Sequence, residues 1–522
     1  MPRSYSRWRA GWAKARKAVR APSFPELFFS VLLLAAFGRT AWREGLLYDG
    51  DPGWHIRTGE FILQNGAVPQ HDLFSFTRPG ESWFAWEWLA DVIFAKLHAW
   101  GGLEALVAFA AVALCGSAAL LLCWLLRRGV GLWIALSLTL AVASASSIHN
   151  LARPHLFSLL LFTVALWVLD EDRRRPSALV WSLVPLAALW ANLHGGFVAW
   201  LGTLGVLLAA TACERNWAAL HRYGWLTGMS AAATLINPYG WRLHDHIVRY
   251  LGSSWIMDNV QEFQSPRIRS ENMQVFAVLL LVGVALASRT LLRRHWFEGM
   301  LVLVWALASL RSARHIPLYA VAAAPVIASE WAAWWAAVAA RSHGRSLARI
   351  FWDTGQELGQ ARRWGLWAPV LGTLTLSLVW TQAHMTDFPV SQFPVAAVTG
   401  NLDRLAPRAG MPRVLTSDQW ADYLIYRLYP RQRVFFDGRS DFYGPAIGAD
   451  YKALLEGTRR WPDLLARYGF DMALLPLDWP LGSIIEHDPH WLCVYQDSSA
   501  LLFVRRPPEL KGWNGNAECT GG

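Results

Sequence analysis

Tyr48–Arg57 reads Y-D-G-D-P-G-W-H-I-R and follows the first apolar segment of the chain. A glycine separates its two aspartates and a proline follows, a composition typical of a tight turn that directs both carboxylates to one point. Charged groups beside a membrane segment are costly to bury, which favours a functional role. Asp49 and Asp51 are therefore candidates for a general base or for ligands of a divalent cation. The alternative is that Asp51 only caps a helix over 54–65.

The composition predicts an α-helical polytopic membrane protein. Of 522 residues, 54% are hydrophobic and only 16% are charged, whereas soluble domains carry about 25% charged residues. The net charge of +10 comes from short basic clusters between apolar runs. This pattern follows the positive-inside rule and does not indicate a nucleic-acid partner.

We expect about eleven transmembrane helices within a membrane domain that spans 25–384. They are predicted over 25–42, 103–126, 131–148, 155–170, 178–194, 197–213, 224–239, 273–289, 296–311, 314–333 and 365–384. The basic clusters between them fall on one side, which places a basic tail, 1–24, in the cytoplasm. The large loops 43–102 and 237–272 and the C-terminal region 385–522 are then external, in the periplasm of a Gram-negative cell.

The first external loop is predicted to hold two helices, over 54–65 and 83–100. The second places Glu87 and Asp91 on one face among aromatic residues. Such a helix suits the membrane interface better than a crossing. Alternatively, the two acids simply face water.

Four further segments bring polar side chains to the same external face. They contribute His149 and Arg153–His155, His194, the loop with Arg242 and Glu262, and the pair Arg314 and His315. Convergence of these side chains would make an external site for a lipid-borne substrate. The alternatives are that His194 is a packed, hydrogen-bonded residue and that arginines at helix ends extend to the interface.

Residues 385–522 alternate between strand and helix patterns, which predicts a small soluble α/β domain. The region lacks a glycine-rich phosphate loop, a G-x-S-x-G motif and zinc-ligand spacing, so we do not expect it to carry chemistry. Asp437 and Arg439, in F-F-D-G-R-S-D, are interpreted as turn residues. A sugar-binding role, or a place at the mouth of the membrane domain, is the alternative.

This layout resembles the GT-C superfamily of integral membrane glycosyltransferases, which includes protein O-mannosyltransferases, the aminoarabinose transferase of lipid A and the catalytic subunit of oligosaccharyltransferase. The resemblance rests on the D-x-D at 49–51 in the first external loop and on the interface helix over 83–100. The short motifs D-P-G-W-H-I-R-T-G-E, E-W-L-A, N-L-H-G-G-F, N-P-Y-G and R-H-I-P are similar to those of a bacterial GT-C-like group. The mannosyltransferase Asp-Glu pair and the W-W-D-Y-G motif of oligosaccharyltransferase are missing.

The resemblance implies that a sugar is transferred, with inversion, from a polyprenyl-phosphate carrier to an acceptor on the outer face of the cytoplasmic membrane. Such transfer needs a base for the acceptor and cations for the leaving phosphate. Asp51 is the first candidate for the base and Asp49 the second. The candidates for binding the substrate and its phosphate are Arg314, His315, Arg242, His194, His55 and Glu87.

A divalent cation, Mg²⁺ or Mn²⁺, is a further expectation, with Asp49, Asp51 and Glu262 as its ligands. Three other functions stay open: a transporter or flippase of lipid-linked sugar, a non-catalytic scaffold of an envelope assembly, and a polysaccharide polymerase or ligase. A transporter predicts charges near the middle of its spans, whereas the charges here lie mainly at span ends. The acceptor, whether glycan, lipid or protein, leaves no readable motif.

Overall fold

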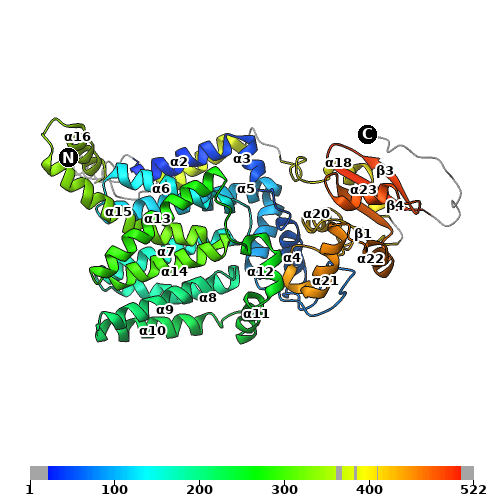
Figure 1. The fold of residues 1–522 in the computed structure, drawn as a ribbon, viewed down its shortest axis with the longest axis horizontal. Helices are drawn as coiled ribbons and strands as arrows, with labels where there is room; N and C mark the ends of the chain where they lie inside the picture. The colour runs from blue at the N-terminus through cyan, green and yellow to red at the C-terminus, as the bar shows by residue number, and fades with distance from the viewer. Residues whose placement is uncertain (1–21, 360–366, 381–384, 408–409, 507–522) are drawn as a thin grey trace, which may run out of the picture.

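The computed structural model describes residues 22–359, 367–380, 385–407 and 410–506 (Figure 1). The predicted tail 1–24 therefore lies outside the described residues except for its last three positions. The helices of the N-terminal part are α2 (Phe24–Phe37), α3 (Thr40–Gly45), α4 (Pro52–Asn65), α5 (Trp88–Arg127), α6 (Leu132–Ser146), η1 (Ser147–His149), α7 (His155–Arg174), η2 (Ala178–Ser182), α8 (Leu183–Leu193), α9 (Phe197–Cys213), α10 (Trp217–Ala233), α11 (Trp241–Leu251), α12 (Ser254–Asn259), η3 (Gln261–Phe263), α13 (Glu271–Leu292), α14 (Trp296–Arg311), η4 (Ala313–His315), α15 (Ile316–Arg341), α16 (Leu347–Gly359) and α17 (Trp367–Trp380).

Within the described residues, each of the eleven predicted spans overlaps a helix. Among the described residues, four helices are long and apolar enough to cross a membrane: Trp88–Arg127, Leu132–His149, Met273–Leu292 and Ala313–Arg341. The others are shorter than the roughly 20 residues that cross unaided. The mainly helical fold is confirmed, while the count of eleven spans stays a prediction.

The predicted interface helix over 83–100 is the first half of a longer element. Helix α5 begins at Trp88 and continues through a kink at Gly101 and Gly102, whose backbone leaves the helical region, into the predicted span 103–126. Gly102 has a φ of +63°, a conformation that glycine adopts readily. The kink lets one element supply both an external segment and a crossing.

The C-terminal domain is the predicted small α/β unit. It contains α18 (Val395–Gly400), α19 (Leu402–Leu405), β1 (Val414–Leu415), α20 (Asp418–Leu428), α21 (Ser440–Leu455), α22 (Trp461–Tyr468), β2 (Met472–Pro476), α23 (Pro480–Glu486), β3 (Trp491–Gln496) and β4 (Ala500–Arg505). The sheet has the order β1-β2-β4-β3, with β1 and β2 parallel and the other pairs antiparallel. Met472 lies opposite Val414 on one side and Val504 on the other.

The stretch R-V-F-F-D-G-R, predicted as a strand followed by a turn, is not a strand of this sheet. Val434 makes only isolated bridges, to Val414 of β1 and to Ser75 of the first external loop. The backbone N–H of Phe76 donates to the carbonyl of Val434 at 3.0 Å, and the N–H of Val434 donates to the carbonyl of Phe74 at 2.9 Å. The segment therefore joins the first loop to the C-terminal domain.

Helices α4 and α20 pack against each other at close range, because glycines in the first loop leave room for the backbone of α20. A Cβ on Gly50 would collide with the carbonyl of Gln419, and one on Gly53 would collide with the carbonyl of Asp422. The N–H of Gly50 also donates to Oε1 of Gln419 at 2.7 Å. The glycines of Y-D-G-D-P-G are therefore explained by this contact as well as by the turn.

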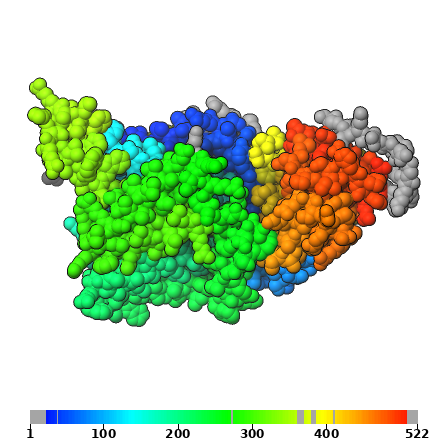
Figure 2. All heavy atoms as spheres, in the orientation of Figure 1, coloured from blue at the N-terminus to red at the C-terminus, as the bar shows by residue number. Residues whose placement is uncertain are grey.

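One hydrophobic core joins α2, α4, α5 as far as Ala119 and the C-terminal domain, and a second core fills most of the remaining helical part. Figure 1 shows the C-terminal domain at one end of the helices and α16 at the other. In Figure 2 the first external loop, in blue, passes beneath the C-terminal domain, in orange and red. The loop and the domain are thus packed as one unit, although the sequence changes at 385 from apolar spans to the pattern of a soluble domain.

Candidate active site

A cavity of about 370 Å³ lies between one end of the helical part and the C-terminal domain. Charged groups from five segments line it: Asp51, Glu87, Arg153, Glu262, Arg314, Arg439 and Asp441. Trp54, Trp83, Trp86 and Trp305 supply aromatic surface. The external polar segments therefore meet, as the sequence predicted.

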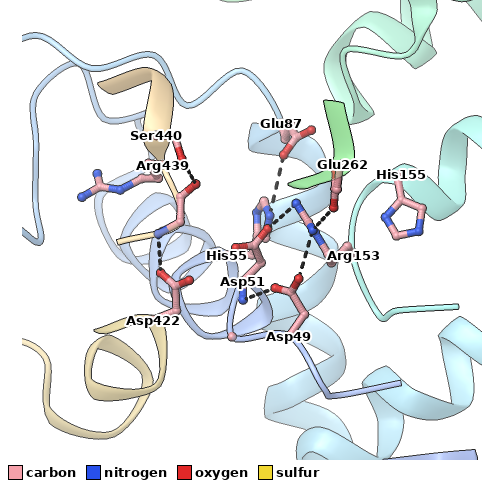
Figure 3. A network of polar contacts seen from close by, with 12 residues as sticks. Asp49, Asp51, His55, Glu87, Arg153, His155, Glu262, Asp422, Arg439 and Ser440 are labelled. Atoms are coloured by element: carbon pink, nitrogen blue, oxygen red, sulfur yellow. Dashed lines mark hydrogen bonds and ion pairs between the residues drawn. The ribbon is translucent and has the colours of Figure 1, made fainter. Parts of the chain in front are cut away.

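Arg153 is the centre of the charged cluster (Figure 3). One of its nitrogens lies 2.6 Å from Oδ2 of Asp51, and the other lies 3.0 Å from Asp49 and 2.5 Å from Glu262. Its side chain is 22% exposed and lines the cavity. A planar guanidinium can hold several carboxylates at fixed angles, so Arg153 sets the orientation of both aspartates.

The two aspartates of the turn have different tasks. Asp49 accepts the backbone N–H of Asp51 through Oδ1 at 2.9 Å, which closes an Asx-type turn. Asp51 precedes the first residue of α4, yet its side chain makes no cap hydrogen bond. The helix-cap interpretation of Asp51 is thus wrong, because its carboxylate is directed to Arg153 and the cavity.

Burial decides the protonation of this cluster. It raises the pKa of Asp51 to about 7, a change that Arg153 opposes and Asp49 reinforces. Burial also acts to raise the pKa of Glu262, but Arg153 and Arg314 hold it well below its usual range. Glu262 therefore stays ionised, while Asp51 is suited to accept a proton near neutral pH.

At the wall of the cavity, Glu87 lies between two histidines. His55 Nε2 is 3.7 Å from one of its oxygens and His194 Nε2 is 3.5 Å from the other. Asp91 contacts Nδ1 of His55 at 2.5 Å, and Ser158 contacts Nδ1 of His194 at 2.7 Å. The idea that Glu87 and Asp91 simply face water is wrong, because Asp91 is fully buried and Glu87 is nearly so.

Burial favours an uncharged Glu87 and a neutral His55. Burial raises the pKa of Glu87 to about 8, although Arg153 opposes the rise. Burial lowers the pKa of His55 well below its usual range, and Arg153 adds to the effect. Glu87 can therefore donate a hydrogen bond to a substrate at neutral pH.

The phosphate candidates do not all meet. Arg314 lines the cavity, 3.7 Å from Glu262 and over the ring of Phe263. His315 also lines it, beside Trp305. Arg242 is exposed, lies over the ring of Phe84 and is not a lining residue.

The three predicted metal ligands lie close together, but they surround the side chain of Arg153. Asp49, Asp51 and Glu262 all pair with Arg153, whose guanidinium takes the place between them. Within the described part of the chain, no group of three His, Cys, Asp or Glu residues is arranged to hold a metal ion. The arrangement does not fit a metal ion, so no step below uses one, and a divalent cation stays a prediction from the sequence.

The C-terminal domain also borders the site, as the alternative interpretation of Asp437 and Arg439 expected. Gly438, Arg439 and Asp441 line the cavity, and Asp422 of α20 lies against Gly438. Asp437 and Arg439 are not exposed turn residues, since their side chains are 0% and 1% exposed and pair with each other. The domain is thus part of the wall of the site.

Sequence reasoning placed Arg153 among the converging polar residues without giving it a role, and it missed Asp422. A signal for Arg153 exists: R-P-H at 153–155 precedes an apolar span, as R-H-I-P at 314–317 does. Asp422 lies within an ordinary amphipathic helix, D-Q-W-A-D-Y, where an acid is unremarkable. The sequence of a soluble domain offers no contrast that would have singled it out.

Comparison with curated proteins gives local matches. No family model matches the chain. The undecaprenyl phosphate-alpha-4-amino-4-deoxy-L-arabinose arabinosyl transferase of Pseudomonas aeruginosa strain PAO1 is 34% identical over 125 residues, 21% of this chain and 23% of that protein. The protein of the same name from strain UCBPP-PA14 is 30% identical over 162 residues, 30% of this chain and 29% of that protein. The chain therefore matches less than a third of the length of these relatives.

Solved structures with a similar layout are more distant in sequence. The oligosaccharyltransferase of Archaeoglobus fulgidus in the apo form aligns with 94% of this chain and 75% of its own, with a TM-score of 0.47 and 11% identity. ArnT from Cupriavidus metallidurans in the apo state aligns with 91% of this chain and 97% of its own, with a TM-score of 0.46 and 13% identity. The curated matches are thus local matches to transferases of an undecaprenyl-phosphate sugar, and they agree with the resemblance to GT-C membrane glycosyltransferases noted from the short motifs.

Proposed function

We propose that the protein is a membrane glycosyltransferase that moves a sugar from a polyprenyl-phosphate-linked donor to an acceptor on the outer face of the cytoplasmic membrane. The observation that carries the proposal is Asp51. Its carboxylate lines the cavity, one oxygen is held by Arg153 at 2.6 Å, and burial raises its pKa to about 7. The curated relatives are named as transferases of an undecaprenyl-phosphate sugar, which supports the same class of donor.

In this reaction Asp51 takes the proton of the acceptor hydroxyl or amine. The acceptor atom forms a bond to the anomeric carbon of the sugar as the bond from that carbon to the phosphate oxygen breaks. The polyprenyl phosphate leaves with the electron pair. A single displacement of this kind inverts the anomeric configuration.

Cationic groups are needed where the negative charge of the leaving phosphate develops. Arg314 is suited to this task, because its one ion pair, with Glu262, is long at 3.7 Å and the residue lines the cavity. Arg153 is fully engaged with three carboxylates. Its task is to orient Asp51 and to add positive potential beside the reacting atoms.

The proposal includes the orientation of the chain in the membrane. The basic clusters lie between spans on the side opposite the cavity, which supports a cytoplasmic N-terminus and an external C-terminal domain. A reporter enzyme that works only outside the cytosol, fused after Pro508, is expected to be active. Activity of a cytosolic reporter at that position would reverse the orientation.

The test of function is a transfer assay with purified protein in lipid nanodiscs and a panel of radiolabelled polyprenyl-phosphate sugars, with glycan and lipid acceptors. Asp51→Asn keeps the shape of the side chain but not its basicity, so transfer is expected to fall by about 10²–10⁴-fold. Asp258→Asn, at an exposed position of the second large loop, is the matched control. Transfer at the wild-type rate by Asp51→Asn would refute the role of Asp51. Passage of the donor across the bilayer without transfer would favour a transporter.

A further inference from the structure

Asp422 of the C-terminal domain is a buried acid that the mechanism above does not use. Figure 3 shows it on the C-terminal-domain side of Asp51. Its Oδ1 accepts the backbone N–H of Gly438 at 3.1 Å. Its Oδ2 is buried and has no hydrogen-bond partner among the described residues. A buried carboxyl oxygen without a hydrogen-bond partner destabilises the folded protein. Its presence here therefore needs an explanation.

Gly438 shows what faces this oxygen. A Cβ on Gly438 would collide with Oδ1 of Asp51 and would lie 2.8 Å from Oδ2 of Asp422. The two oxygens therefore approach the same point from the two halves of the molecule. Only a glycine leaves that point open, so the narrow gap between the carboxyls depends on this residue.

Two carboxylates that face each other in a buried place do not both ionise readily, because each charge repels the other. When one of them keeps its proton, that proton supplies the missing hydrogen-bond donor between them. Asp51 has its other oxygen on Arg153, which favours the charge on Asp51. The proton then resides on Asp422.

We propose that Asp422 is a positioning residue, delivered by the C-terminal domain, that shares one proton with Asp51 across Gly438 and so keeps the base ionised and oriented. This inference rests on the proposed function, in which Asp51 is the base. It assigns a chemical task to the C-terminal domain: the domain completes the acid pair of the site.

The surroundings of Asp422 agree with a protonated acid. The charged groups that bear on it are carboxyls: Asp51 from the first loop, Asp437 from the segment before α21, and Asp418 from its own helix. Burial, followed by repulsion from Asp51, raises the pKa of Asp422 well above its usual range. Arg153 lies behind Asp51 and pairs with that residue.

The proton balance of the transfer is simple. Before the reaction Asp422 carries the shared proton and Asp51 is ionised. The acceptor gives its proton to Asp51 as the bond between sugar and phosphate breaks, so both acids are then neutral. Asp51 afterwards releases its proton to water in the cavity, which restores the starting state.

The first test compares two substitutions by the pH dependence of transfer. Asp422→Asn keeps a hydrogen-bond donor toward Asp51, so the acidic limb of the profile is expected near its wild-type position. Asp422→Leu has a similar volume but no donor, so the ionised form of Asp51 is less stable and its pKa rises. The limb is expected to move to higher pH by about one unit, with about fivefold less transfer at neutral pH. A packing role alone would leave the limb in place for both variants.

The second test does not depend on activity. Infrared spectra of the wild-type protein at neutral pH are expected to contain a protonated carboxyl band to which Asp422 and Glu87 both contribute, and this band is expected to be weaker in both Asp422 variants. Asp478→Asn, an exposed position of the same domain, should keep this band. An unchanged band in the Asp422 variants would refute the shared proton, even if transfer is observed. A wild-type protein with the band but without transfer would refute the proposed function and leave the acid pair standing.

Discussion

Two arginines, Arg153 and Arg439, are each held by more than one carboxylate, but their surroundings differ. Arg439 lies between Asp437 at 2.6 Å and Asp72 at 2.9 Å, its guanidinium contacts three aromatic rings, and its side chain is 1% exposed. Arg153 has three carboxylates, no ring contact recorded among its described neighbours, and a side chain 22% exposed at the cavity. Pairing of an arginine with carboxylates thus joins the first loop to the C-terminal domain at Arg439, and it orients Asp51 at Arg153.

The two arginines differ in how accessible their guanidinium groups are to a ligand. A guanidinium enclosed by aromatic rings and carboxylates has a fixed environment, and its removal leaves buried charges without compensation. A guanidinium at a cavity can respond when a charged ligand enters. Arg439 is therefore expected to matter for folding, and Arg153 for the reaction.

The largest expected effect on stability belongs to Arg439→Met. This change leaves Asp437 and Asp72 buried and unpaired, so the free energy of unfolding should fall by about 3–5 kcal/mol. The measurement is thermal or denaturant unfolding in detergent. Arg249→Met, which breaks an exposed ion pair with Asp245, should change stability by less than about 1 kcal/mol. Equal stability of the two variants would remove Arg439 from the domain interface.

A smaller effect, on rate and not on stability, is expected for Arg153→Lys. Lysine keeps the charge but cannot hold Asp49, Asp51 and Glu262 at fixed angles. Transfer should fall by about 10–10²-fold because Asp51 loses its orientation, while the unfolding temperature stays close to the wild-type value. Arg314→Lys, whose ion pair is long, should reduce transfer by less. If Arg153→Lys unfolded the protein as Arg439→Met does, the contrast between the two arginines would be lost.

Much of the fold could be predicted because apolar runs report directly on helices. The predicted spans correspond to helices, and the alternation after 385 gave the correct class for the C-terminal domain. The errors lie where tertiary contacts override local pattern. Residues 433–439 read as a strand followed by a turn, yet Val434 pairs with Ser75 of the first loop as well as with Val414. By contrast, the predicted division between 83–100 and 103–126 agrees with the kink of α5 at Gly101 and Gly102.

Only part of the candidate site could be predicted from the sequence, for a related reason. Asp49, Asp51 and Arg314 stand out because charge is rare beside apolar segments. Asp422 is one of several acids in a soluble domain, and its partner is far away in the sequence. The contact between the two halves, such as that of Gly50 with Gln419, joins residues 369 positions apart. No periodicity or motif reports on a contact of that range.

The close fit of α20 against the glycines of the first loop also affects how the protein is made. Synthesis proceeds from the N-terminus, so the turn with Asp51 is made long before residues 415–440 have been translated. Until then the turn lacks Gln419, Asp422 and Gly438, and its acid pair is incomplete. A chain that is still being synthesised, or one that ends before α20, therefore cannot hold a finished site. The order of synthesis itself delays activity until the C-terminal domain has folded and docked.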